Sequence, residues 1–278
     1  MPLNSQFLPR QNSERFPRRA AVTIVAGFRC VDGIVICSDT QENMSGYIKR
    51  DVPKIEVREA EATDGPRAIF AGSGDGGFVD YLVDKLWDAM KSSTSVSEMT
   101  EAAEKEILTR YTELTPAYPS GLPDAELLVS LWASPHEMDL IKINGPVVNR
   151  GCNLEAIGYG WVIATYIAER LLWIKTYLAD AVPIAIYMIE QAKRHVSECG
   201  GETLVTTLSS IDGKILTFDK ECMKDYEQRI EIADERAREI VGLALNDRIS
   251  DEQFDLLLED SIARLKASKR KTNSKKAK

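Results

Sequence analysis

The pair of apolar runs between residues 23 and 39 constrains the fold most, because almost every position in them is apolar. Val and Ile dominate both runs, and the Asp32-Gly33 pair between them is a tight-turn signal. The pattern predicts a β-hairpin. Strands that are apolar at nearly every position are typical of strands covered on both faces, whereas half-exposed strands alternate. We therefore expect this hairpin to lie inside the molecule, between other layers.

The remaining periodicity places helices in pairs between blocks of strands. This order argues against a doubly wound parallel sheet and favours antiparallel sheets with helices outside them. Two stacked sheets between helical layers would bury the apolar strands on both faces. The expected strands lie at 54–60, 67–72, 126–134, 138–144, 202–211 and 214–219. The expected helices lie at 78–92, 95–114, 161–178, from about Pro183, and at 224–245 and 250–267.

Composition excludes several classes of protein. The chain has 278 residues, of which 44% are hydrophobic, enough for one large domain with or without an appendage. A net charge of −8 does not suit a surface that coats nucleic acid. No 18-residue apolar stretch or secretory signal is present, so we expect neither a membrane span nor export.

Cysteine and histidine usage bears on the chemistry and the compartment. The five cysteines never form a CxxC pair, which argues against a metal site and a disulfide framework. We expect a reducing, cytoplasmic location, with no metal and no cofactor. Only two histidines are present, so a mechanism that needs a histidine base has little to work with.

Changes in composition divide the chain into four parts. Residues 1–22 are polar and arginine-containing, and are interpreted as a leader or propeptide. Residues 23–221 form the main domain, and 222–268 form a helical C-terminal extension. Residues 269–278 form a basic tail that we expect to be disordered.

This order of elements, with the residues at their ends, resembles the proteasome β-subunit and HslV family of N-terminal-nucleophile (Ntn) hydrolases, and a bacterial proteasome-like protein within it. In that family a threonine starts the first strand, a glycine turn follows, an aspartate ends the second strand, and a lysine comes one loop later. Thr23, Gly33, Asp39 and Lys54 fall in those places. The stretches "VPKIEV", "IFAGSGDGG" and "AIGYG" match further family segments. The resemblance implies an α+β fold, a four-layer αββα sandwich, with the helical extension added.

The resemblance also implies roles for individual residues. A threonine hydroxyl needs a base, and an α-amino group with a pKa near about 8 can serve once the chain is cut before Thr23. Lys54 supplies positive charge that disfavours protonation of this amine, and Asp39 holds Lys54 in position. The backbone N–H of Gly72 stabilises the oxyanion, and water resolves the acyl-enzyme.

Four positions depart from the family pattern. Val22 stands where the family has glycine at the cleavage point, and a β-branched residue there is stiff. Tyr159 replaces a serine beside the nucleophile but keeps a hydroxyl, so it remains a candidate site residue. Val196 replaces a supporting aspartate, and Cys199 lies near a family Ser-Gly-Gly loop. The Thr-Asp-Lys set is complete, whereas its supporting residues are not.

Three functions follow from these features. The first is a threonine-type endopeptidase that exposes Thr23 by self-processing, cleaves peptides or unfolded proteins, and forms a homo-oligomeric ring, with an ATPase unfoldase as a further partner. The second is a non-catalytic ring or scaffold subunit that keeps its leader. The third is an Ntn amidase acting on a small molecule, because a fold alone does not choose between amide chemistries.

Overall fold

A computed structural model of the protein describes residues 23–44, 48–62, 64–172, 175–218, 220–246 and 248–276. The expected leader, 1–22, lies outside the described residues, and so does Val22. Within them the fold is mixed α and β, with three antiparallel sheets and six α-helices. This confirms the expectation of antiparallel sheets with helices outside them.

The first sheet contains the apolar hairpin. Strands β1 (Ile24–Cys30) and β2 (Gly33–Asp39) pair with each other, and β2 is buried at every position. They lie near the centre of the order β10-β1-β2-β11-β12, which explains why they are apolar on both faces. The flanking strands are β10 (Leu154–Gly158), β11 (Thr203–Ser209) and β12 (Ile215–Thr217).

The second sheet has the order β5-β6-β7-β8-β9, and all of its neighbouring pairs are antiparallel. A separate two-stranded sheet, which the sequence did not predict, joins β3 and β4. The bounds are β3 (Gln41–Met44), β4 (Ile48–Asp51), β5 (Ile55–Glu59), β6 (Arg67–Gly74), β7 (Ala125–Ser134), β8 (Glu137–Asn144) and β9 (Val147–Asn149).

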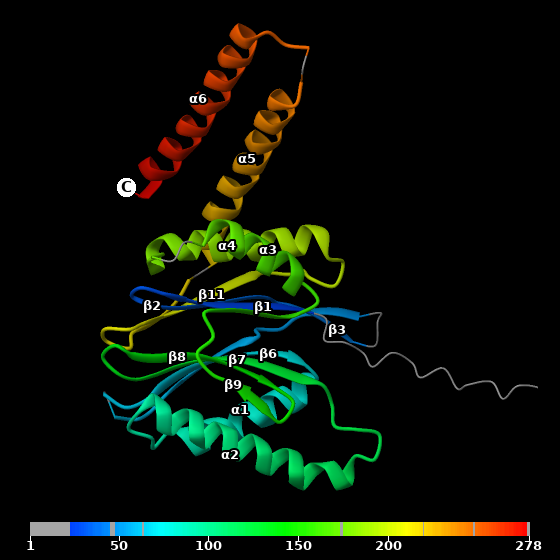
Figure 1. The fold of residues 1–278 in the computed structure, drawn as a ribbon, viewed down its shortest axis with the longest axis vertical. Coiled ribbons are helices and arrows are strands. Elements are labelled where there is room, and N and C mark those ends of the chain that lie inside the picture. Colours follow the sequence, from blue (N-terminus) through cyan, green and yellow to red (C-terminus); the bar gives the residue numbers. More distant parts are fainter. Residues whose placement is uncertain are drawn as a thin grey trace, which may run out of the picture.

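Helix pairs cover the outer faces of both sheets (Figure 1). Helices α1 (Gly76–Met90) and α2 (Val96–Leu114) pack on the second sheet through one apolar cluster. Helices α3 (Trp161–Leu171) and α4 (Leu178–His195) pack on the first sheet through another. A third cluster, with Val25, Ile36 and Ile69 among its members, fills the space between the sheets. We call the strand surfaces that line this space the inter-sheet faces.

The boundary between α3 and α4 differs from the prediction. The sequence predicted one helix over 161–178 and a second helix from about Pro183, but α3 ends at Leu171 and α4 begins at Leu178. Asp32, in the turn between β1 and β2, accepts the Leu178 N–H at 2.8 Å and so defines the first turn of α4. Pro183 then lies inside the helix, where burial of the α4 apolar face outweighs the backbone bond that proline cannot make.

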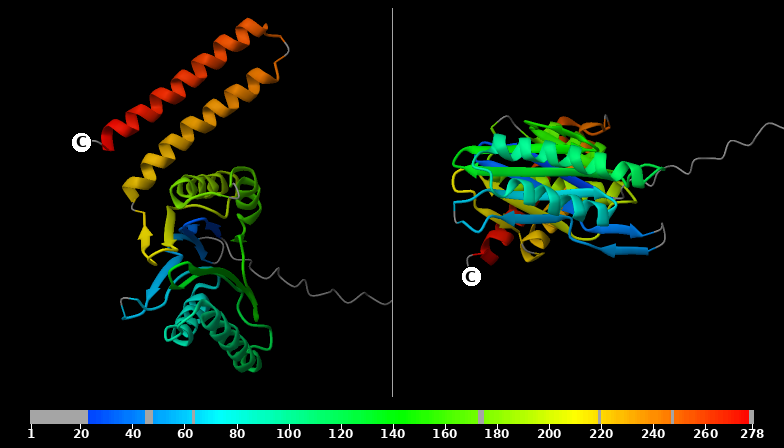
Figure 2. Two further views of the ribbon diagram at one scale, coloured as in Figure 1. Left: turned by 60° about the vertical axis from the view of Figure 1, so that its left-hand side comes forward. Right: turned by 90° about the horizontal axis from the view of Figure 1, so that it is seen from below.

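Helices α5 (Lys220–Ala244) and α6 (Asp251–Lys276) form a hairpin that projects from the body (Figures 1 and 2). Its base is attached to α4, where Asp234 accepts hydrogen bonds from Tyr187, Gln191 and Arg194. Helix α6 continues to Lys276, into the segment expected to be disordered. In the described part of the chain, no helix is both long and apolar enough to cross a membrane.

Candidate active site

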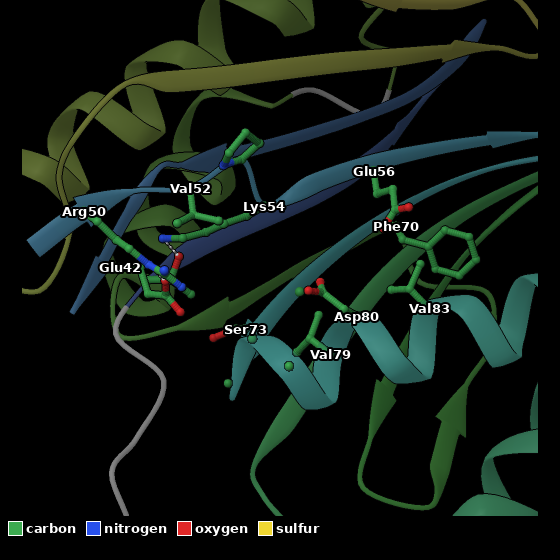
Figure 3. A pocket seen from close by; sticks show the side chains of 16 residues that line it. Glu42, Arg50, Val52, Lys54, Glu56, Phe70, Ser73, Val79, Asp80 and Val83 are labelled. Atoms are coloured by element: carbon green, nitrogen blue, oxygen red, sulfur yellow. Dashed lines mark hydrogen bonds and ion pairs between the residues drawn. The ribbon is translucent and has the colours of Figure 1, made fainter. Parts of the chain in front are cut away.

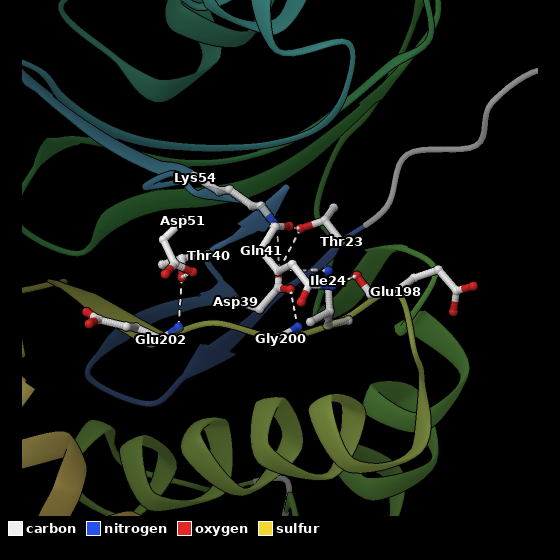
Figure 4. A network of polar contacts seen from close by, with 10 residues as sticks. All are labelled: Thr23, Ile24, Asp39, Thr40, Gln41, Asp51, Lys54, Glu198, Gly200 and Glu202. Atoms are coloured by element: carbon white, nitrogen blue, oxygen red, sulfur yellow. Dashed lines mark hydrogen bonds and ion pairs between the residues drawn. The ribbon is translucent and has the colours of Figure 1, made fainter. Parts of the chain in front are cut away.

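Thr23, Asp39 and Lys54 are in direct contact (Figure 4). The Thr23 hydroxyl donates to Asp39 Oδ1 at 2.7 Å and accepts a hydrogen bond from Lys54 Nζ. Lys54 Nζ also forms an ion pair with Asp39 Oδ1 at 2.6 Å. The strand pairing brings them together, because Thr23 precedes β1, Asp39 ends the neighbouring strand β2, and Lys54 enters β5 of the facing sheet.

Backbone groups hold the two charged side chains in place. Asp39 Oδ2 accepts the Gly200 N–H at 2.9 Å, and Asp39 Oδ1 accepts the Ile24 N–H at 3.2 Å. Lys54 Nζ donates to the Gln41 carbonyl oxygen at 2.5 Å. A carboxylate that accepts from two backbone N–H groups is strongly oriented, so this geometry is preformed.

The site is buried, and this changes the chemistry of the amine. The side chains of Lys54 and Asp39 are only 9% and 0% exposed, and Thr23 is 2% exposed. Burial lowers the pKa of Lys54 from its usual value, an effect that the charge of Asp39 opposes. A lysine with a lowered pKa gives up its proton more readily, and here it contacts the hydroxyl of a potential nucleophile.

A cavity of about 330 Å³ opens beside these groups, with Thr23 and Lys54 in its lining. Figure 3 shows Lys54 and Glu42 at one end and Phe70 and Val83 towards the other. Its walls mix apolar and charged side chains: Val52, Val79, Glu42, Arg50, Glu56 and Asp80. The space can therefore hold an extended group beside the Thr23 hydroxyl.

Gly72 lies in this cavity, but its N–H already has a partner. It donates to the Lys54 carbonyl oxygen at 3.3 Å, a long bond in the ladder between β5 and β6. The neighbouring hydroxyl of Ser73 is buried and has no hydrogen-bond partner among the described residues. The backbone donor expected at this position is therefore not free in this structure.

The loop before α3 positions the backbone of Thr23 rather than its hydroxyl. The Gly160 N–H donates to the Thr23 carbonyl oxygen at 3.3 Å. Gly158 has φ +79°, and a Cβ there would lie 2.3 Å from the same oxygen, so only glycine fits. Tyr159, between them, is 46% exposed and lines a different cavity with Trp161, so the structure does not bring it to the Thr23 hydroxyl.

The segment between α4 and β11 contains the two remaining residues singled out in the sequence, Val196 and Cys199. Cys199 is buried, and burial followed by the charge of Asp39 raises the pKa of its thiol to about 12, so it stays protonated. Val196 packs against the apolar cluster under α3 and α4. The sequence pointed to the Cys199 loop but not to the Gly200 N–H, because a backbone donor carries no side-chain signal.

Comparison with known proteins identifies the fold. No protein-family model matches the sequence, and neither does any curated protein. Among solved structures, Anbu (ancestral beta-subunit) from Yersinia bercovieri superposes with a TM-score of 0.68 at 13% identity, over 82% of this chain and 100% of that one.

The chain has the Anbu fold.

Two further Anbu structures agree. Anbu from Hyphomicrobium sp. strain MC1 gives a TM-score of 0.62 at 12% identity, over 82% of this chain and 100% of that one. Anbu from Pseudomonas aeruginosa, described as a helical assembly, gives 0.63 at 13% identity, over 82% and 99%. At such identities the likeness concerns the fold alone.

The assignment to the proteasome β-subunit and HslV family was therefore wrong. The structures that this chain resembles are Anbu proteins, which are proteasome-like but form a distinct family. The error has a simple cause: a threonine, an aspartate and a lysine around one hairpin locate a strand arrangement. These three residues do not distinguish between related families that share this strand arrangement.

Proposed function

We propose that this protein is a threonine-type peptidase with Thr23 as its nucleophile, on a four-layer αββα sandwich of the Ntn-hydrolase type. The observation that carries the proposal is the buried contact between the Thr23 hydroxyl, Lys54 and Asp39. In covalent catalysis a base contacts the nucleophile, and a third group orients the base. Thr23, Lys54 and Asp39 would fill these three roles. The adjoining cavity supplies room for a substrate.

The chemistry follows from the same contacts. Lys54, with its pKa lowered by burial, accepts the hydroxyl proton as Thr23 Oγ1 attacks the carbonyl carbon of a peptide bond. The C–N bond breaks, the proton passes to the leaving amine, and an ester to Thr23 remains. Water then hydrolyses the ester. Asp39 keeps the amine in place throughout.

Cleavage of the chain before Thr23 is part of the proposal. Thr23 is 2% exposed, so a cut before it would open the residue further towards the cavity that it lines. Cleavage would also free the Thr23 α-amino group, a second nitrogen base with a pKa near about 8. Both nitrogens then lie within reach of one hydroxyl.

Assembly is the third part of the proposal. The Pseudomonas aeruginosa Anbu structure is a helical assembly, and this chain shares its fold at a TM-score of 0.63. We propose that this protein also forms a homo-oligomer, in which peptide or unfolded protein substrates reach Thr23 from an enclosed side.

The second candidate is a non-catalytic subunit that keeps residues 1–22. The bonded Gly72 N–H favours it, because an oxyanion needs a free donor at the position that attack creates. In this case Lys54 and Asp39 stabilise the folded chain, and the protein cleaves no substrate.

One experiment separates the candidates. The full-length protein is purified, its N-terminus is sequenced, and it is treated with a peptide β-lactone, which acylates hydroxyl nucleophiles. We expect a chain that begins at Thr23 and one label on that residue. Thr23→Ala should lose both, and Thr112→Ala, an exposed helical threonine on α2, should lose neither. An uncut, unlabelled wild type would favour the scaffold.

A further inference from the structure

Ser73 is a buried hydroxyl for which the fold supplies no partner. It is 3% exposed, and its Oγ makes no hydrogen bond among the described residues. Leaving a buried donor unpaired costs free energy, so natural structures rarely do it without a reason. Within the described part of the chain, Ser38 and Ser130 are buried and unpartnered as well, but of these three serines only Ser73 lines the cavity beside Thr23.

The position of Ser73 in β6 explains what the hydroxyl faces. Side chains alternate along a strand, and Ile69 and Ala71 belong to the cluster between the two sheets. Ser73 thus belongs to the inter-sheet face of β6. On β1, Val25 belongs to the same cluster, and Thr23 lies two positions before it, directly ahead of the strand. Ser73 and Thr23 line the same cavity.

Ser73 follows Gly72, the residue expected to supply the oxyanion donor, and both line the cavity. Its neighbour Gly72 donates its N–H to the Lys54 carbonyl oxygen at 3.3 Å. Figure 3 shows Ser73 on the side of the cavity that holds Lys54 and Glu42, away from Phe70. Among the described side chains of β6, Ser73 is the one unpartnered hydrogen-bond donor in the lining of this cavity.

We propose that the Ser73 hydroxyl donates a hydrogen bond to the carbonyl oxygen of the group that Thr23 attacks, and so acts as the side-chain donor of the oxyanion site. The inference rests on the proposed peptidase function and names a catalytic residue for it. Thr23 Oγ1 adds to the carbonyl carbon, its proton goes to Lys54, and the negative oxygen that forms is bound by Ser73. Ser73 itself is neither oxidised nor acylated.

The structure offers a matched control in Ser130. This residue, on β7, is 0% exposed and its Oγ is also unpartnered among the described residues, but it does not line the cavity of Thr23. Ser73→Ala and Ser130→Ala each remove an unpaired buried hydroxyl, so neither should lower the melting temperature. Only the first should alter the reaction.

The test measures inactivation by a peptide β-lactone in full-length wild type and in both variants, with their melting temperatures. For Ser73→Ala we expect the maximal inactivation rate to fall about 100-fold, the effect typical of losing one oxyanion donor. Its half-saturating inhibitor concentration should change less than about threefold, because the donor acts mainly in the transition state. Ser130→Ala should match wild type in both quantities.

Three results would overturn the proposal, and they differ from one another. If wild type is labelled at Thr23 and Ser73→Ala reacts equally fast, Ser73 has no catalytic role and the peptidase function stands. A clear fall in the melting temperature of Ser73→Ala alone means that the hydroxyl has a structural partner. A wild type that begins at Thr23 but is never labelled removes the peptidase function and the Ser73 role with it.

Discussion

At the scale of single residues, the site depends on Lys54, whose pKa is subject to two opposite influences. Lys54 Nζ pairs with Asp39, which favours the charged amine, and it is buried, which favours the neutral one. It also donates to the Thr23 hydroxyl. A base needs a neutral lone pair, so the balance between these two effects decides whether the hydroxyl can be activated.

Lys54→Arg tests the role of the amine as a base. Arginine keeps the positive charge beside Asp39 but stays protonated at any working pH. We expect β-lactone labelling of Thr23 to slow by about 100-fold or more, within the range for loss of a general base. Lys49→Arg, an exposed lysine of β4, is the control and should label at the wild-type rate. Equal labelling of Lys54→Arg and wild type would exclude Lys54 as the base.

The pKa of Lys54 also predicts a pH dependence of stability. Burial lowers its pKa in the folded state below the usual 10.5, so the unfolded chain binds more protons between the two values. Stability contributed by this group therefore rises as pH increases through that window, by at most about 1.4 kcal/mol per pH unit. Urea unfolding of wild type and Lys54→Met across this range measures it.

The comparison with Lys54→Met has a defined outcome. The wild-type free energy of unfolding should increase relative to the variant as pH rises towards 10.5. A constant difference between the two proteins, or a difference that shrinks with pH, would show that the pKa of Lys54 is not lowered.

At the scale of secondary-structure elements, short loops carry the site. The loop between β10 and α3 holds the Thr23 backbone through Gly160, and Gly200, before β11, holds Asp39. Neither loop contributes a side chain to the contact between Thr23, Asp39 and Lys54. Their backbone geometry therefore matters more than the chemistry of their side chains.

Gly158→Ala tests this dependence. Its Cβ would lie 2.3 Å from the Thr23 carbonyl oxygen, on a residue with φ +79°. Gly151→Ala is the matched control, because that glycine has φ +66° and open space around it. Each substitution carries the backbone strain of about 1–3 kcal/mol, but only Gly158→Ala displaces Thr23. We expect Gly158→Ala to unfold at clearly lower urea and to lose Thr23 labelling.

Gly151→Ala separates the effect of backbone strain from the effect of the close approach to Thr23. If Gly151→Ala and Gly158→Ala lose the same stability and both label normally, the close approach of Gly158 to Thr23 has no consequence for the site.

Asp234 supplies polar contacts between α5 and α4. Asp234→Ala removes hydrogen bonds of 3.0 Å from Tyr187, 2.5 Å from Gln191 and 2.7 Å from Arg194. We expect faster amide hydrogen exchange in α5, with unchanged exchange in β1 and β2, because the hairpin opens without the body. Glu231→Ala, an exposed change on the same helix, should leave α5 as in wild type. Unchanged exchange in Asp234→Ala would show that apolar packing alone holds α5.

At the scale of the whole molecule, the body and the hairpin differ in how they are packed. The body buries three apolar clusters, whereas the projecting hairpin leaves Leu245 at 77% and Leu256 at 68% exposed. Large exposed apolar side chains on a projecting element are typical of surfaces that meet other chains.

Assembly is the prediction that belongs to this scale. The proposed homo-oligomer predicts that sedimentation-velocity measurements on the purified protein give a multiple of the mass of its own chain, because the projecting hairpin exposes Leu245 and Leu256 for contact with other chains. The assembled species should grow with concentration, and dilution should release the monomer. A single species with the mass of one chain at all concentrations would exclude the homo-oligomer and the enclosed site with it.

The sequence by itself determined the strand hairpin at the centre of the fold and the pairing of helices outside the sheets. Apolar residues at every position of β2 have no stable place except between two covered faces. Thr23, Asp39 and Lys54 were named in advance through a family resemblance, and the structure brings their side chains into contact.

Only the tertiary structure decided the features that depend on groups far apart in the chain. Asp32 defines the start of α4 across 146 positions, which places Pro183 inside a helix that local signals would begin later. Gly200 reaches Asp39 across 161 positions, and the Gly72 N–H is occupied by the carbonyl oxygen of Lys54, the residue just before β5. A hydrogen bond between groups far apart in the chain leaves no local pattern in the sequence, so only the folded structure shows it.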